Sequence, residues 1–128
     1  MTQSLEDYLE TVYVLIKNGN SAGVRAVADT LGVKMPSVVK AVHELKKMEL
    51  VTQEPYQSIK LTEKGERVAK LVLNRHNLIK NFLISLGVSK KTADKDACLM
   101  EHILSAETLD KIKSYTENKK KKKNEKPN

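Results

Sequence analysis

Two short helices joined by a tight turn, over residues 23–50, constrain the fold of this chain more than any other feature. In both segments apolar residues recur at three- and four-residue spacing, which indicates amphipathic helices. Gly32 stands where the first helix must end, because glycine readily adopts a left-handed backbone. Pro36 stands where the second helix begins, a place where its missing N–H has no helical partner anyway. The pattern predicts a helix-turn-helix, with an ordinary helical hairpin as the alternative.

A short hairpin and a capped helix follow the two helices. Residues 50–52 and 58–61 are rich in strand-forming side chains, and they flank the polar loop 53–57. Thr62 then supplies an N-cap for another helix. This order of elements is that of a winged helix-turn-helix.

A winged helix-turn-helix implies a surface for duplex DNA. The second helix of the motif enters the major groove, where its early exposed side chains meet base edges. Residues of the wing reach phosphates, which position the protein without specifying sequence. We therefore expect DNA contacts from Lys34, Pro36, Ser37, Val39 and Lys40, and from Lys60 in the wing.

Charge and cysteine content narrow the class of protein. The net charge is +7, but residues 117–128 contribute +4 of it through six lysines and two glutamates, and residues 1–62 are neutral. Basicity is therefore mainly a property of the tail, and DNA binding rests on the motif. The single cysteine excludes an internal disulfide and suits a reducing compartment. Since the chain shows no signal peptide, apolar span, phosphate-binding loop or zinc-protease motif, we expect a cytoplasmic protein that is not an enzyme.

Potential metal ligands lie on both sides of the DNA-binding pattern. Cys98, Glu101 and His102 have the i, i+3, i+4 spacing that places them on one face of a helix. Asp7 and Glu10 repeat the i, i+3 spacing near the start of the chain, and a third segment carries His76. Each has an ordinary explanation: early acids favour the helix dipole, and a lone cysteine is often a small buried residue. Together they form a set of thiolate, carboxylate and imidazole donors suited to a transition metal.

Amphipathic helices are predicted over the rest of the chain. One covers residues 4–17 with Ser4 as its N-cap, and three follow the wing, over residues 63–86, over a segment capped by Ser89, and over residues 105–115. The last three have more apolar surface than one small lobe needs, so we expect a homodimer that matches a palindromic operator. The predicted fold is mostly α, with a winged helix-turn-helix DNA-binding domain over 1–62, a helical metal-binding and dimerisation domain over 63–116, and a disordered lysine-rich tail over 117–128.

Residues 4–116 resemble the diphtheria-toxin-repressor family of metal-dependent regulators, and in particular its short manganese-responsive branch. The resemblance is carried by the segment 5–13, the helix-turn-helix, the segment 61–65, Arg75-His76 and the segment 98–105. It implies a dimeric repressor activated by Fe²⁺ or Mn²⁺. By motif match, the family's metal-ligand positions are Asp7, Glu10, His76, Cys98, Glu101 and His102.

The chain departs from this family at three positions. Cys98 stands where the manganese branch has a carboxylate, and Asp7 stands where the iron branch has methionine, so the site is a hybrid. Lys80 stands where the family usually has a glutamate, which removes one ligand and adds a cation. A second metal site is therefore less assured than the first.

Three functions are compatible with these patterns. The leading hypothesis is a metal-dependent (Fe²⁺/Mn²⁺) transcriptional repressor that controls genes of metal homeostasis. One alternative is a metal-independent winged-helix regulator, in which the polar cluster is a salt-bridge network that includes Lys80. A small metal-binding protein or a metalloenzyme is the other alternative, and it leaves the helix-turn-helix and wing unexplained.

Overall fold

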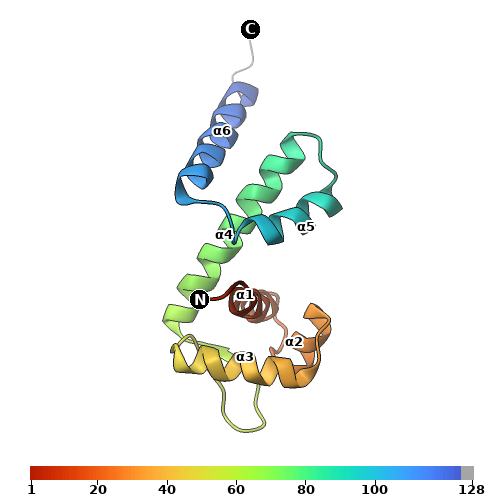
Figure 1. The fold of residues 1–128 in the computed structure, drawn as a ribbon, viewed down its shortest axis with the longest axis vertical. Helices are drawn as coiled ribbons and strands as arrows, with labels where there is room; N and C mark the ends of the chain where they lie inside the picture. Colours follow the sequence, from red (N-terminus) through yellow and green to blue (C-terminus); the bar gives the residue numbers. More distant parts are fainter. Residues whose placement is uncertain (125–128) are drawn as a thin grey trace. The chain divides into compact units, whose positions relative to one another are not determined.

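A computed structural model describes residues 1–124, with side chains up to residue 119. The chain forms two compact units that meet between Val72 and Leu73, within one long helix. Figure 1 shows the fold and labels its helices. The elements are α1 (Gln3–Lys17), α2 (Val24–Leu31), α3 (Met35–Lys47), β1 (Val51–Thr52), β2 (Lys60–Leu61), α4 (Glu63–Ser85), α5 (Lys90–Met100) and α6 (Ala106–Asn124). The predicted mostly α fold, with a winged helix-turn-helix first and a helical lobe second, is confirmed.

The core of the first unit lies among α1, α2 and α3, which contact one another pairwise. Each helix turns its periodic apolar positions inward, as the sequence predicts. Burying a large aliphatic side chain contributes about 1.5–3 kcal/mol, so these residues dominate the stability of the unit. The largest fully buried side chains of the unit are Leu9, Val12, Val27, Val38, Leu45, Leu50, Ile59 and Val72.

The turn between α2 and α3 has the predicted geometry. Gly32 ends α2 with a φ of 67°, in the left-handed region. The N–H of Val33 then donates to the carbonyl of Ala28 at 3.0 Å, which satisfies a carbonyl left over at the helix end. Pro36 occupies the first turn of α3. These local backbone features define the turn of the helix-turn-helix.

The wing is a two-stranded antiparallel sheet that pairs Val51 with Leu61 and Thr52 with Lys60. The N–H of Ile59 extends the pairing by donating to the carbonyl of Ala22 at 2.9 Å. Ile59 is only 1% exposed, so the hairpin is anchored in the core of the first unit.

The start of α4 is fixed to the end of α3. The Thr62 hydroxyl accepts from the N–H of Gly65 at 3.0 Å, as predicted for an N-cap, and donates to the carbonyl of Glu49 at 2.7 Å. Gly65 lies so close to Leu50 that a Cβ atom there would collide with the Leu50 carbonyl. Residue 65 must therefore be glycine for this approach. The first half of α4 thus belongs to the first unit, which is why the unit boundary falls later than the predicted boundary at residue 62.

The second unit contains the later part of α4 with α5 and α6. Gly87 ends the α4 segment with a φ of 98°, and the Ser89 hydroxyl caps α5 by accepting from the N–H of Thr92 at 3.4 Å, as predicted. Phe82 of α4 and Tyr115 of α6 pack edge to face, with ring centroids 5.7 Å apart. No helix among the described residues is long and apolar enough to span a membrane.

Two sequence expectations differ from the structure. The N-cap of α1 is Thr2 and not Ser4, because the Thr2 hydroxyl accepts from the N–H of Leu5 at 3.2 Å and the helix starts one residue before Ser4. The last helix continues past Tyr115 to Asn124, whereas a disordered tail was expected from residue 117. Lysine is a good helix former, so a lysine-rich segment can extend a helix that is already nucleated. The remainder of the expected tail, residues 125–128, lies outside the described residues.

Candidate functional site

The first half of α3 presents an exposed surface with both apolar and basic side chains. All five residues expected to contact DNA here are exposed, and Val39 is 56% exposed although it is aliphatic. Val38 between them is fully buried and holds the helix in the core of the unit. The helix therefore presents an exposed face at the positions where a helix-turn-helix is expected to meet the groove. Its predicted members are Lys34, Pro36, Ser37, Val39 and Lys40.

Met35 and His43 lie on the same helix, and the sequence analysis named neither of them. Both are exposed, and Met35 is 47% exposed at the first position of α3. Their helical spacing could have indicated them, because Met35 lies four residues before Val39 and His43 lies four residues after it, which places both on the same face as Val39. Ser37 and Lys40 stand at the edge of the face, where they line a pocket with Leu5 and other residues at the start of α1.

The wing carries a second set of exposed groups. Lys60 on β2 is exposed and lines a groove in which Lys17 and Lys70 also lie. The ammonium of Lys17 lies 5.7 Å from the ring centroid of Tyr13. At the tip of the wing, Tyr56 is fully exposed with a φ of 62°, which is unusual for a residue other than glycine. The basic groups suit phosphate contacts.

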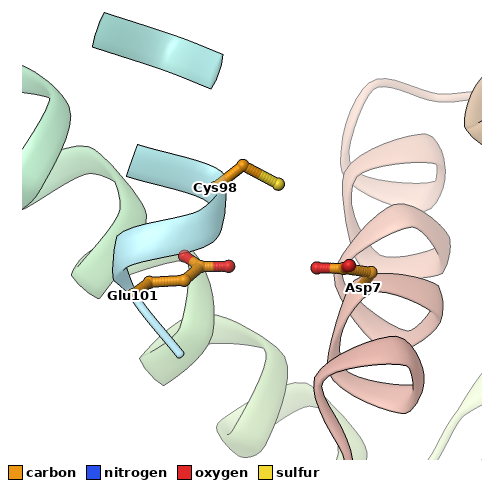
Figure 2. Close-up of side chains that lie close together, drawn as sticks. All are labelled: Asp7, Cys98 and Glu101. Atoms are coloured by element: carbon orange, nitrogen blue, oxygen red, sulfur yellow. The ribbon is translucent and has the colours of Figure 1, made fainter. Parts of the chain in front are cut away.

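In the first unit, the predicted metal ligands are Asp7 and Glu10 of α1. Both side chains are half-buried, and their i, i+3 spacing places them on one face of the helix. The backbone carbonyl of Asp7 also accepts from the Thr11 hydroxyl at 2.8 Å. Figure 2 shows the carboxylate of Asp7 projecting from α1.

In the second unit, Glu101 is the centre of a buried cluster. Its side chain is fully buried, at the C-cap of α5. One carboxylate oxygen lies 3.2 Å from Nε2 of His102, and the other lies 3.7 Å from Nδ1 of His76. The Sγ atom of Cys98 lies within 4.8 Å of a Glu101 oxygen. Figure 2 shows Cys98 and Glu101 projecting from the end of α5. Four of the six predicted ligands therefore gather within this unit.

Lys80, which the sequence analysis placed near the cluster, and Asp94, which it did not name, join the cluster at His76. Nε2 of His76 lies 2.9 Å from Oδ1 of Asp94, and the ammonium of Lys80 lies 3.2 Å from the same oxygen. The hydrogen bond to His76 and the charge of Lys80 lower the pKa of Asp94, while burial opposes the shift. Asp94 lies four residues before Cys98, so its spacing could have indicated it. The Lys80 ion pair is one element of the salt-bridge network in the metal-independent alternative.

The cluster in the second unit fits a divalent transition metal. A fully buried carboxylate with two imidazoles and a thiol nearby supplies the donor types that such ions prefer. Nδ1 of His76 is buried and makes no hydrogen bond within the part of the chain that the structure describes. Leaving a buried ring nitrogen unpaired costs about 1–3 kcal/mol, and a metal ion would remove that cost.

Comparisons with known proteins agree with these features. Residues 1–59 match the family described as "Iron dependent repressor, N-terminal DNA binding domain", and residues 62–128 match "Iron dependent repressor, metal binding and dimerisation domain". A helix-turn-helix regulator of Methanocaldococcus jannaschii, itself uncharacterised, is 42% identical over 91% of this chain and 95% of its own length. The transcriptional regulator MntR of Bacillus subtilis is 38% identical over 87% of this chain and 78% of its own length.

The fold is also similar to solved structures. The manganese regulator SloR superposes with a TM-score of 0.80 and 26% identity, over 91% of this chain. This chain spans 55% of the SloR chain. The SloR chain thus has further sequence beyond the part to which this chain corresponds.

Proposed function

The chain belongs to the iron-dependent repressor family, and we propose that it is a metal-activated transcriptional repressor. This family is the diphtheria-toxin-repressor family named above, and the chain belongs to its MntR-like branch. It binds duplex DNA as a homodimer, requires a divalent transition metal, and is a regulator and not an enzyme. A repressor of this kind acts in the cytoplasm, where its operator is. One observation carries the proposal: the buried carboxylate of Glu101 lies beside two imidazoles, with Cys98 nearby.

The proposed metal ligands come from both units. His76, Cys98, Glu101 and His102 supply the share of the second unit, and Asp7 and Glu10 supply the share of the first. The support is their donor chemistry, their half-buried or buried state and their match to the family's ligand positions.

A bound divalent cation would neutralise the negative charge of the carboxylates. Without it, carboxylate ligands repel one another, and the proposed ligand set is not assembled. With it, the unit that carries α3 is held in the arrangement that binds an operator. In terms of linkage, the metal increases the population of the DNA-competent state because it binds that state more tightly than the other states of the protein.

The homodimer is supported by exposed apolar side chains in the second unit. Ile103 is 76% exposed and Leu86 is 58% exposed. Phe82, Leu86, Ile112 and Tyr115 also line an apolar pocket there. Large exposed apolar surfaces of this kind favour association with a partner. A two-fold dimer presents two copies of α3 to the two half-sites of a palindrome.

The decisive experiment compares DNA binding with and without metal. Duplexes that bind the protein are first selected from a randomised pool in the presence of Mn²⁺. Binding of the selected duplex is then titrated with Mn²⁺, with Fe²⁺ under anaerobic conditions, and with EDTA. We expect specific binding only with metal. Equal binding in EDTA would support the metal-independent regulator instead.

Glu101→Gln tests the site itself. It removes a charged ligand and keeps the side-chain shape. Replacing a group that only orients a ligand already lowers metal affinity by about 10–100-fold, so the loss of a ligand should lower it by at least about tenfold. Isothermal titration with Mn²⁺ measures the metal affinity, and a binding assay with the selected duplex measures the operator affinity. Asp96→Asn, which removes an exposed acid from the same helix, is the matched control.

Lys40→Ala separates the two halves of the function. It should weaken operator binding and leave metal affinity unchanged in the absence of DNA, because Lys40 is an exposed residue of α3. Loss of metal affinity in this variant would contradict the assignment of Lys40 to the DNA surface.

A further inference from the structure

The tip of the wing carries an aromatic side chain that takes no part in the core. Tyr56 is fully exposed, whereas Tyr8 and Tyr13 of the same unit are buried. A tyrosine ring is one of the largest groups that folding can bury, and aromatic side chains at the surface are enriched where proteins meet partners. The exposure of Tyr56 therefore points to a role in binding.

The backbone at Tyr56 also has a conformation that tyrosine does not favour. The N–H of Gln57 donates to the carbonyl of Glu54 at 3.0 Å and closes a four-residue turn. Pro55 is second in this turn, and Tyr56, with a φ of 62°, is third. These are features of a type II turn, in which glycine or asparagine is the ordinary third residue. Tyrosine here costs the turn stability and adds nothing to the core, so its value lies in what the side chain meets outside the fold.

The rest of the wing fixes the position of this turn within the first unit. The side-chain amide of Gln53 donates to the carbonyl of Gln57 at 3.0 Å across the loop. At the base of the loop, β1 pairs with β2, and Ile59 is buried in the core of the unit. β1 also contacts α3. The tip of the wing and the exposed face of α3 are therefore parts of one compact unit, and both can meet the same duplex.

The wing is long enough to pass the edge of the groove that α3 enters. Figure 1 shows its loop, in yellow-green, projecting past α3. Tyr56 lies four residues after Thr52, the last residue of β1, and four extended residues span up to about 13 Å. This reach is comparable with the width of the major groove, about 12 Å. With α3 in the major groove, the tip can therefore reach the minor groove beside it.

The groups at the tip suit a groove better than a phosphate backbone. Residues 53–57 contain one acid, Glu54, and no base, so the loop gains nothing from the charge of phosphates. Tyr56 offers an uncharged ring and a hydroxyl. In the minor groove, an A·T pair presents only acceptors, whereas a G·C pair also projects the amino group of guanine. A tyrosine hydroxyl can donate to such an acceptor, and the guanine amino group would occupy the same space.

We propose that Tyr56 reads the minor groove next to the half-site that α3 occupies: its ring lies in the groove, and its hydroxyl donates to an acceptor of an A·T pair. The wing thereby adds a preference for A·T pairs at positions that α3 does not reach. This inference rests on the proposed function and adds the residue, the groove and the base pairs that the wing recognises.

The test begins with selection from one randomised duplex pool in the presence of Mn²⁺, by wild type and by Tyr56→Ala. Wild type should enrich A·T pairs at positions that flank the half-sites. Tyr56→Ala should lose this enrichment and keep the sequence that α3 selects. The variant should also bind the duplex selected by wild type at least about fivefold more weakly, which is the ordinary effect of losing one base-pair contact.

Modified bases identify the groove. Replacing the flanking adenines by 2,6-diaminopurine adds an amino group in the minor groove and leaves the major-groove edge of the pair unchanged. This replacement should weaken wild-type binding by about fivefold or more and have little effect on Tyr56→Ala. At the same positions, inosine–cytosine pairs, which lack the guanine amino group, should bind wild type better than guanine–cytosine pairs do.

A second variant separates binding from folding. Tyr56→Gly relieves the backbone at this position, so it should unfold at the same temperature as wild type or higher. It should nevertheless bind the selected duplex as weakly as Tyr56→Ala does. Glu49→Gly is the matched control, because Glu49 is the other residue besides glycine with a positive φ in residues 1–124. This control should keep the base preference of wild type and lose no affinity.

Flanking preferences that persist in Tyr56→Ala, or a wild type that is insensitive to 2,6-diaminopurine, would overturn the inference and leave the proposed function intact. Equal DNA binding by wild type and Tyr56→Ala would overturn it as well, and would favour a protein partner for the exposed ring. If wild type selected no duplex in the presence of Mn²⁺, the proposed function would fail together with this inference.

Discussion

At the scale of single residues, Cys98 gives the proposed centre its chemical character. A thiolate is a soft ligand that favours Fe²⁺ over Mn²⁺, whereas the carboxylates of Asp7, Glu10 and Glu101 are hard ligands that keep Mn²⁺ acceptable. The site therefore combines both preferences. The raw affinity of most protein sites for Mn²⁺ is the lowest among these ions, so the effective metal also depends on availability.

Cys98→Glu should shift this balance toward Mn²⁺, because it replaces the one soft donor with a hard one. In wild type we expect Fe²⁺ to activate operator binding at a lower free concentration than Mn²⁺. In the variant the ratio of the two activating concentrations should change in favour of Mn²⁺. Operator affinity against free metal, measured anaerobically for each ion, gives the ratio. An unchanged ratio would mean that Cys98 is a packing residue and not a ligand.

Asp94 should add a pH-dependent term to stability. Its pKa lies below its ordinary value of 3.8, chiefly because of the hydrogen bond to His76. A carboxyl group whose pKa is lowered by folding stabilises the folded state above its unfolded pKa, and this stabilisation is lost as the pH falls through the folded pKa. The term should be less than about 1 kcal/mol, because the Asp94 side chain is 56% exposed and its ion pairs are screened.

The measurement is urea unfolding of the metal-free protein at pH 7 and pH 3, for wild type and Asp94→Asn. Wild type should be the more stable at pH 7, and the difference should shrink at pH 3. A difference that stays constant between these two pH values would show that the carboxylate charge is not responsible.

At the scale of secondary-structure elements, the junction of the wing with α4 is the most constrained contact. Gly65 approaches the Leu50 carbonyl so closely that any Cβ atom would collide with the backbone. Backbone cannot move aside as a flexible side chain can. The junction also contains the Thr62 hydroxyl, which bonds both helix ends.

Gly65→Ser should therefore destabilise the first unit by about 1–3 kcal/mol or more, as overpacking against a fixed neighbour does. Urea unfolding followed by circular dichroism measures the change. The matched control is Gly23→Ser, which inserts the same side chain where nothing lies within 4 Å of the new Cβ atom and where serine is a good N-cap for α2. Equal stability of the two variants would contradict the close approach.

At the scale of the whole molecule, the charge is unevenly distributed along the chain. Residues 1–62, which contain the winged helix-turn-helix, are neutral, and residues 117–128 hold +4 of the net +7. Specific recognition therefore depends on the shape and donors of the α3 face. The lysine-rich end can add attraction to any polyanion, without sequence information.

Truncation after Lys119 tests this division. It removes five lysines, so binding to random-sequence duplex should weaken and become less dependent on salt. The specific, metal-dependent binding of the selected duplex should be retained. Titrations of the random-sequence duplex and of the selected duplex at several salt concentrations give the salt dependence of each affinity. Loss of metal activation on truncation would show that the end of the chain contributes to the metal response.

The sequence by itself determined the elements and their order. Gly32, Pro36, Thr62 and Gly87 act through backbone conformation or hydrogen bonds to near neighbours, and such local effects can be read from the residue types. The three-residue spacing of Cys98 and Glu101 also required only the geometry of one helix. The local rule failed at Ser4, because Thr2, two residues earlier, can also cap the helix and is the N-cap in the structure.

The tertiary structure decided which charges meet. Asp94 and Lys80 lie fourteen residues apart on different helices, and only the packing of α5 against α4 brings Asp94 to both Lys80 and His76. The burial of Glu101 beside two imidazoles likewise depends on contacts between α4 and α5. Sequence spacing gives the side chains that share a helix face, whereas desolvation and ion pairing depend on what the rest of the fold brings to that face.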